Sequence, residues 1–435
     1  MQNKYYITLA LFFTILKIYP QIKSPLSELG IGNLNPVGLS SNFAMGGISS
    51  AYVSTKYINP YNPASLSRLR YTGAETGLHI SQNNYTQNNA TSVYNNFTST
   101  SAIIGFPLGG GLGFAAGILP YSSKNYAYEN TISVDGDLMV TKKSEGKGNV
   151  SDLFLGFGGK LKFLSVGARG SFLFGNLQNI SKAEYSSINF VNVRKIDNNI
   201  IRGFNLDVGA QIELKVNEEK RWIIGGNARV YDYFFNTNYQ TLNDYLIATQ
   251  IVDGEVVRIE RHDNSVNLFN NYDSRTTQQV LLPSKYDFGI SYSKENSYLF
   301  SLQYNNENWT NFALNNSRNY LSLAQKISFG GEWLPNINAG GYGSFWRKMN
   351  YRMGLYAGQA PYIIENNQIM EYGINFGISA PLKRMKYETE LFGSYLNFGL
   401  GYGYRGVNSV IAENIFHFNL SVVLNDKWFI QRKFN

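Results

Sequence analysis

Every second residue from Phe416 to Leu424 is apolar, and most of the residues between them are polar. Alternation with a period of two predicts a β-strand with one apolar and one polar face. The same pattern runs through residues 204–213, 286–292 and 372–379. A shift of one residue would exchange the two faces, so the pattern indicates which side of each strand meets apolar surroundings.

Stretches of this kind predict about fourteen strands, and their connections alternate in length. The strands begin near Tyr71, Tyr94, Gly111, Val150, Phe163, Gly203, Trp222, Tyr286, Ser297, Ser322, Asn350, Glu371, Glu388 and Ile415. Tight connections span 107–110, 158–162, 215–221, 293–296 and 381–387, and long ones span 82–93, 120–149, 175–202, 234–285, 306–321, 359–370 and 400–414. Pro335–Met349 departs from this order, because it is long on the side of the tight connections.

Long strands whose connections sort by length are typical of bacterial outer-membrane barrels, in which the long loops face the outside. The alternative is a secreted β-sandwich or propeller, whose strands would be shorter, about five or six residues. The predicted fold is therefore all-β, a transmembrane antiparallel barrel of about 14 strands. An even strand count places both ends of the barrel on the periplasmic side.

The chain divides into four predicted parts. Residues 1–21 resemble a signal peptide, with Lys4 before an apolar run from Ile7 to Leu16. Residues 22–70 form an irregular N-terminal hatch or plug segment, rich in Gly, Ser, Asn and Pro. The barrel occupies 71–427, and 428–435 form a periplasmic tail in which Trp428 and Phe429 are expected to anchor the chain at the membrane interface.

Composition narrows the possible functions. Charged residues make up 16% of the 435 residues, below the roughly 25% of soluble domains, whereas aromatic residues reach 15%. The chain has no cysteine, which excludes thiol catalysis, thiolate metal sites and disulfides. Its formal net charge of +8 is not gathered in a dense basic run, so nucleic-acid binding is not predicted.

A barrel of about fourteen strands is too wide for wall side chains alone to fill, so residues 22–70 are the candidate filling. This segment contains Met45-Gly46-Gly47 and, further on, Asn62-Pro63-Ala64. The second motif predicts a short helix in which Asn62 caps the first turn and Pro63 takes the first helical position.

These motifs, placed between a signal peptide and the first strand, resemble the long-chain fatty-acid transporter (FadL-type) family. The resemblance continues through Leu282-Pro283-Ser284 and Tyr351-Arg352-Met353-Gly354, and is strongest to a branch common in Bacteroidota. It implies a 14-stranded outer-membrane barrel with an N-terminal hatch that passes hydrophobic molecules. The chain departs from the family in ending on Asn435 instead of Phe.

Several charged or titratable residues fall on the polar faces of predicted strands. We expect the following to face the lumen: Glu75, His79, Arg169, Asp207, Arg229, Asp287 and His417. If the first and last strands pair, His79 and His417 become neighbours. Because both signs occur, the charged members are expected to pair and to hold the hatch, with wall packing as the plainer alternative.

No motif in the chain predicts catalysis, a cofactor or a metal. There is no Gly-x-Ser-x-Gly elbow, and Gly109-Gly110-Gly111 lies in a tight connection without the Lys-Ser/Thr of a phosphate loop. The acidic residues between 244 and 263 lack the spacing of a calcium loop. Val252–Val256 predicts a small hairpin.

The expected function is passive transport of small hydrophobic compounds, such as fatty acids or hydrocarbons, across the bacterial outer membrane. The expected partners are the bilayer with its lipopolysaccharide and a small hydrophobic ligand. The alternative is a non-transporting barrel that acts as an accessory or partner in a secretion or surface-assembly complex. Relatives of this barrel type resemble the accessory barrel of the type IX secretion machinery, which makes this alternative concrete.

Overall fold

The computed structural model describes residues 25–34, 39–87, 90–135, 137–187, 189–252, 255–261, 272–314, 321–336, 344–387, 390–407 and 411–427. The predicted signal peptide and the predicted periplasmic tail 428–435, with Trp428 and Phe429, lie outside this set. Among the residues described, no helix combines the length and the hydropathy needed to span a membrane.

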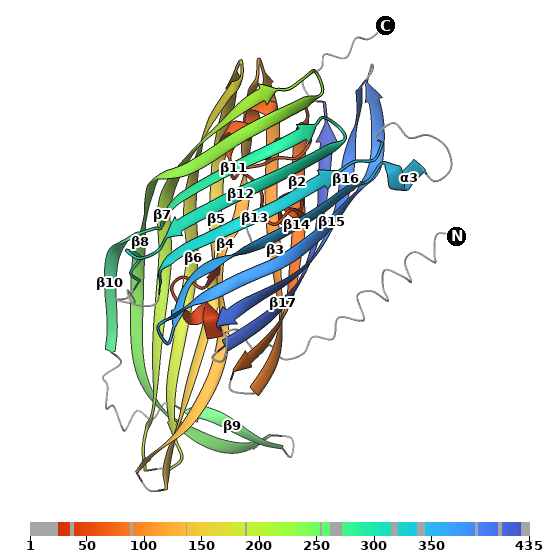
Figure 1. Ribbon diagram of the computed structural model, residues 1–435. Coiled ribbons are helices and arrows are strands. Elements are labelled where there is room, and N and C mark those ends of the chain that lie inside the picture. The colour runs from red at the N-terminus through yellow and green to blue at the C-terminus, as the bar shows by residue number, and fades with distance from the viewer. Residues whose placement is uncertain are drawn as a thin grey trace.

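The strands form one closed antiparallel ring with fourteen positions (Figure 1). The ring runs through β2 to β8, then β10 and β11, which share one position beside β8, and then β12 to β17. Pairing of β17 with β2 over fifteen residues closes it. The bounds are β2 Thr72–Gln87, β3 Ala90–Gly109, β4 Leu112–Asp135, β5 Leu138–Leu161, β6 Leu164–Tyr185, β7 Asn192–Lys215, β8 Lys220–Val252, β10 Tyr272–Leu281, β11 Ser284–Lys294, β12 Tyr298–Asn308, β13 Leu323–Trp333, β14 Asn350–Ile364, β15 Asn367–Tyr387, β16 Glu390–Val407 and β17 Ile411–Asp426.

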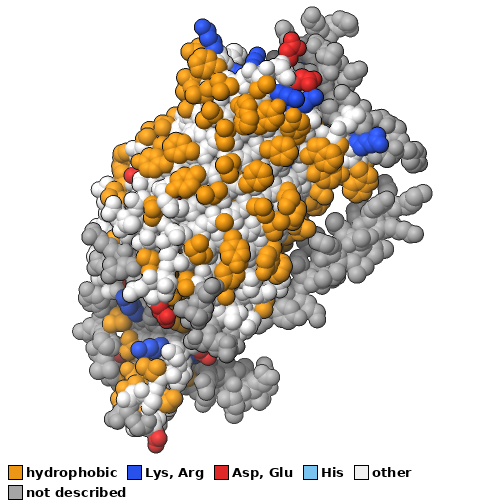
Figure 2. Space-filling view, viewed as in Figure 1, with side chains coloured by type: hydrophobic (Ala, Val, Ile, Leu, Met, Phe, Trp, Pro, Cys, Tyr) orange, Lys and Arg blue, Asp and Glu red, His pale blue; other side chains and the backbone are white. Residues whose placement is uncertain are grey.

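The two faces of the ring differ as the alternation predicts. On β7, Phe204 and Leu206 are exposed, whereas Asn205 and Asp207 are buried. Apolar side chains cover the middle of the face seen in Figure 2, and charged side chains gather toward its two ends. Since a closed ring leaves no strand edge to be satisfied in lipid, this belt places the chain in the bacterial outer membrane.

Several predicted long loops are strands. The segments 120–149, 175–202 and much of 234–285 continue the sheet as the outer parts of β4 to β8, and β8 alone has 33 residues. In the outermost parts of these strands polar residues occur on both faces, so no regular alternation marks them. The predicted small hairpin is present, because Val252 at the end of β8 pairs with Glu255 of β9 (Glu255–Arg261).

The wall is incomplete between β3 and β4. Their pairing stops at Ala102 and Ile118, although both strands continue outward. Pro120, two residues further on, has no backbone N–H to extend the ladder. Beyond it, the edge of β4 pairs with β1 (Asn33–Leu34), a two-residue strand from the N-terminal segment.

The remainder of the N-terminal segment is compact and buried. It contains η1 (Pro25–Glu28), α2 (Ser40–Ala44) and η2 (Pro63–Arg68). Asn62 caps η2 by accepting a hydrogen bond from the Ala64 N–H, and Pro63 opens that turn. A fourth short helix, α3 (Ser344–Arg347), lies in the connection from β13 to β14 at the end of the barrel where β2 starts and β17 ends.

Candidate functional site

The segment from Ser40 to Leu69 is fastened to the inner wall by hydrogen bonds from several strands. The Asn62 amide donates to the carbonyl oxygens of Ser50 and Gly226, at 2.6 and 3.4 Å. The Gln303 Oε1 on β12 accepts from the N–H groups of Ser49 and Ser50, both at 2.7 Å. These contacts satisfy backbone groups that would otherwise be buried without partners.

The backbone of the N-terminal segment also lies directly against the backbone of the wall at positions where the wall residue is glycine. A Cβ added at Gly354 on β14 would lie 2.1 Å from the carbonyl carbon of Met45 and 2.2 Å from the nitrogen of Gly46. A Cβ at Gly209 would lie 2.1 Å from the side-chain oxygen of Asn62. The two predicted motifs therefore contact different parts of the wall, at β14 and at β7. Gly46 adopts a φ of +74° to make its turn.

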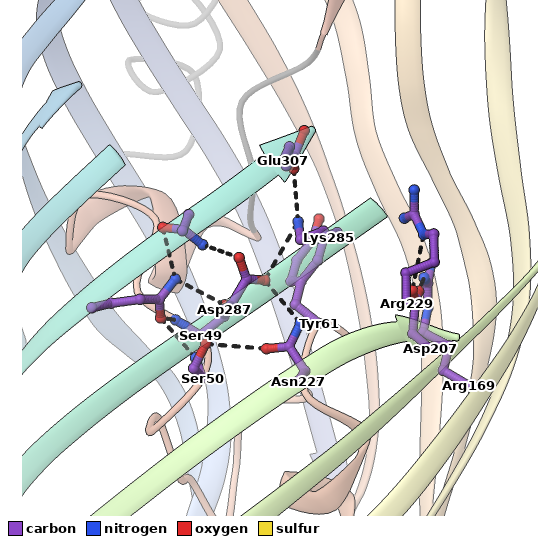
Figure 3. A network of polar contacts seen from close by, with 12 residues as sticks. Ser49, Ser50, Tyr61, Arg169, Asp207, Asn227, Arg229, Lys285, Asp287 and Glu307 are labelled. Carbon is purple, nitrogen blue, oxygen red and sulfur yellow. Dashed lines mark hydrogen bonds and ion pairs between the residues drawn. The ribbon is translucent and has the colours of Figure 1, made fainter. Parts of the chain in front are cut away.

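Charged side chains of the inner wall form a network above this segment (Figure 3). Arg169 lies between two carboxylates, 2.6 Å from Asp152 and 3.0 Å from Asp207. Arg229 reaches the other oxygen of Asp207 at 3.1 Å. Adjacent strands alternate in sign, so each buried charge has a partner and the lumen stays polar at this height.

A second part of the network is linked to the N-terminal segment. Asp287 accepts from Asn227 at 2.8 Å and lies 3.5 Å from Lys285. Lys285 also pairs with Glu307 at 3.1 Å, and the Ser50 hydroxyl donates to Asn227. The charged residues of the wall are thus connected to the segment that they surround.

The closing seam carries three polar contacts at intervals of four residues on both strands. Glu75 accepts from Ser421 at 3.1 Å, the His79 Nε2 lies 3.0 Å from the His417 Nδ1, and Asn83 donates to Glu413 at 3.0 Å. Phe43 of the N-terminal segment packs against both histidine rings. Each contact is diagonal by two residues, so all three depend on one register.

Two cavities of about 150 and 220 Å³ lie in the lumen and share the lining residues Leu34, Lys326, Glu371 and Arg405. The smaller borders the histidine pair, and the larger borders Arg169, Asp207 and Arg229. Both are lined by charges of each sign, so they suit water better than a hydrocarbon.

The extracellular half of the lumen is apolar instead. A buried cluster there joins Leu26 and Ile31 of the N-terminal segment to Trp309, Phe312 and Leu314, which follow β12. Leu34 and Tyr121, at the β1–β4 contact, pack against this cluster, and Tyr94 of β3 belongs to it. The cluster therefore reaches both strands that flank the incomplete part of the wall.

The structure buries Glu75, Arg169, Asp207 and Asp287, and places His79, His417 and Arg229 beside the lumen cavities. The sequence alone does not identify several of their partners. Asp152, Lys285 and Glu307 complete the ion pairs and were not singled out. Asp152 is in phase with the buried Val150 and Phe154, so the inward positions of β5 could have revealed it. Lys285 and Glu307 lie near strand ends, where the alternation is weak.

Comparison with solved structures gives the same architecture. A FadL homologue of Pseudomonas aeruginosa aligns with a TM-score of 0.57 at 10% identity, over 90% of this chain and 99% of that one. The toluene transporter TbuX of Ralstonia pickettii gives 0.57 at 14% identity, over 90% and 98%. The toluene transporter TodX of P. putida gives 0.55 at 12% identity, over 91% and 100%. At these identities the likeness establishes the fold alone.

No curated protein sequence matches the chain significantly. A family model does, over the full length. The model described as BamG matches residues 1–435, and the chain therefore belongs to the BamG family.

Proposed function

We propose that this chain passes small hydrophobic compounds from the cell exterior into the outer membrane, sideways through its wall. The described structural relatives include two toluene transporters, and their fold supports a transport role in general terms. The observation that carries the proposal is the end of the β3–β4 ladder at Ala102 and Ile118.

A sideways path agrees with the chemistry of the lumen. An apolar molecule that entered between the outer strands would meet the cluster around Trp309 and Phe312. Below that cluster lie charged cavities and the fastened segment Ser40–Leu69, which we propose acts as the hatch. Transfer of a hydrocarbon into a charged, wet cavity is unfavourable, whereas the β3–β4 gap leads to lipid. In this proposal β1 is the gate, because it covers the free edge of β4.

The test is to lock β1 to β4. The chain has no cysteine, so Leu34→Cys with Ser122→Cys introduces one defined disulfide between residues that face each other. In liposomes, uptake of radiolabelled toluene or a fatty acid should fall to the level of empty vesicles on oxidation and return on reduction.

The matched control is Ser144→Cys with Ser181→Cys, which joins β5 to β6 at a fully paired position. Oxidation of this pair should leave uptake unchanged. Unlocked protein that confers no uptake, or uptake that continues through the oxidised β1–β4 pair, would contradict the sideways route.

A second candidate is the non-transporting partner of a secretion or surface-assembly complex. The attachment of Ser40–Leu69 to the wall supports it, since a barrel that only holds partners needs a filling that stays in place. Purification from native membranes distinguishes the two: a stoichiometric partner supports this candidate, and a clean monomer that is active in uptake counts against it.

A further inference from the structure

We propose that the periplasmic mouth of the barrel is a docking surface for an acidic segment of a soluble periplasmic protein. This surface is separate from the path suggested for hydrophobic compounds, and it does not depend on that path. It is formed by the turns at the end of the barrel where β2 begins and β17 ends, together with the N-terminal segment between them.

The described residues of this end have a marked excess of positive charge. Apart from the mutually paired Glu332 and Arg352, the basic side chains described there number twelve and the acidic ones five. The basic residues are Lys56, Arg68, Arg70, Lys160, Lys162, Lys215, Lys220, Arg221, Lys294, Arg347, Lys348 and Lys427, and the acidic ones are Glu213, Glu218, Glu219, Glu295 and Asp426. The outer strands, in contrast, mix both signs, as in the pairs Lys143–Glu184 and Lys182–Glu260.

The charges surround a hollow of about 350 Å³. Residues 53–57 and 67–70 of the N-terminal segment line one side, and the turns at Gly111, Lys160 and Lys294–Ser297 line the other. Because the hollow lies between that segment and the turns, its walls separate it from the lipid around the barrel. A peptide from the periplasm would approach it along the barrel axis, whereas the head groups of the bilayer surround the outside of the barrel.

In this hollow, four cationic side chains share the carboxylates of Glu213 and Glu295. Arg68, Lys160 and Arg221 all contact Glu213, whose side chain is 4% exposed. Arg221 also contacts Glu295 at 2.5 Å, and Arg70 lies 3.6 Å from the same carboxylate. Two carboxylates, Glu213 and Glu295, thus face four cations, so the cluster keeps a positive potential that an acidic segment would complement.

The ion pairs at the rim of the hollow are exposed and can be replaced by ion pairs with such a partner. The Arg70 side chain is 56% exposed and that of Lys294 is 35% exposed, so both can exchange their present carboxylates for those of a docked peptide. Exposed ion pairs are weak, and the exchange therefore costs little. A polypeptide is favoured over a single anion because the described basic residues are spread over the β5–β6, β7–β8, β11–β12 and β13–β14 turns and the N-terminal segment.

The test uses purified full-length protein in nanodiscs and a fluorescent polyglutamate peptide, with a neutral Gly-Ser peptide of the same length as the reference. Anisotropy should report binding of polyglutamate alone, and this binding should weaken steeply as salt rises. Arg70→Gln with Lys294→Gln should weaken binding roughly tenfold. The control, Lys142→Gln with Lys147→Gln, removes the same charge from the opposite end of the barrel and should leave binding unchanged.

Three results would overturn the proposal: no binding of polyglutamate, equal losses in the rim and control variants, or displacement of the peptide by short-chain phosphatidylglycerol at equal charge. The last result would assign the surface to lipid head groups. None of these outcomes bears on uptake of hydrophobic compounds, so this proposal and the transport proposal fail separately.

Discussion

Single glycines decide how close the N-terminal segment comes to the wall. At Gly354 the wall backbone lies against Met45 and Gly46 with no space for a methyl group. At Gly170 an added Cβ would meet nothing within 4 Å. A Gly-to-Ala substitution can therefore be made at a tightly packed position, Gly354, and at an open position, Gly170, of the same barrel.

Gly354→Ala should push the segment from the wall and destabilise the fold by about 1–3 kcal/mol, the usual cost of overpacking. The measurement is the urea midpoint and the temperature at which the folded band is lost on a gel. Gly170→Ala supplies the control and should leave both unchanged. Equal behaviour of the two variants would mean that the contact with Met45 is not tight in the membrane.

The seam is also specified by single residues. Glu75, His79 and Asn83 reach Ser421, His417 and Glu413 with the same diagonal offset. Chain order predicts that the first and last strands of a closed ring pair, and therefore that His79 and His417 lie on neighbouring strands. All three contacts also depend on the register, which the sequence of one chain does not define.

At the level of elements, the outermost strands are held by charge because they have little apolar surface. Glu260 of β9 contacts Lys182 of β6 at 2.5 Å and Arg194 of β7 at 2.7 Å. The hydrogen bond from Lys182, followed by the attraction of both cations, lowers the pKa of the Glu260 carboxyl. This ion pair lies beyond the membrane, where salt and pH can act on it.

We expect acid to loosen β9. A carboxyl whose pKa is lower in the folded state stabilises the fold above its unfolded pKa, about 4.3, and loses that effect as the pH falls through the folded value. Proteolysis or hydrogen exchange of residues 246–261 should therefore increase as the pH falls below about 4, and Glu260→Gln should reproduce the increase at pH 7. Glu365→Gln, at another outer turn, is the control. An unchanged hairpin in the first variant would show that these contacts do not hold β9.

How well an element can be predicted from the sequence depends on whether it lies in the membrane or outside it. Strands in the membrane were located within a few residues, because lipid and lumen impose opposite demands on alternate positions. The sequence predicts loops for the outer halves of β4 to β8, because polar residues occur there on both faces and leave no regular alternation. The two-residue β1 is too short to produce a pattern in the sequence. One strand position is divided into β10 and β11 at Leu282-Pro283, a motif that enters the sequence-based prediction only through the family resemblance.

In the whole molecule, the lumen is occupied at two levels. Ser40–Leu69 packs against the wall near the periplasmic end, and the cluster containing Leu26, Ile31 and Trp309 occupies the extracellular half. Fourteen strands would otherwise enclose a channel wide enough for water and ions. The N-terminal segment contributes to the outer level through residues 25–34 and to the inner level through residues 40–69, so its two contributions can be removed separately.

Planar-bilayer recordings should therefore find no steady ion conductance for the intact chain. Deleting residues 25–34 removes only the contribution of the segment to the outer level, and this variant should also show no steady conductance. Deleting 25–70 removes both contributions of the segment and should open a large, stable conductance. Heat-modifiable migration on a gel shows whether each deletion variant has folded. Steady conductance of the intact chain would contradict the occupied lumen.

The close contacts between the wall glycines and the N-terminal segment also constrain the order of biogenesis. The segment touches β12 through Gln303, β14 through Gly354 and β7 through Gly209, so it contacts the ring on several sides. A folded core of this width does not thread easily into a finished ring. We expect the sheet to wrap around the segment as a template, with pairing of β2 and β17 as the last step. The segment would then act on the rate of assembly before it acts on anything that passes through the barrel.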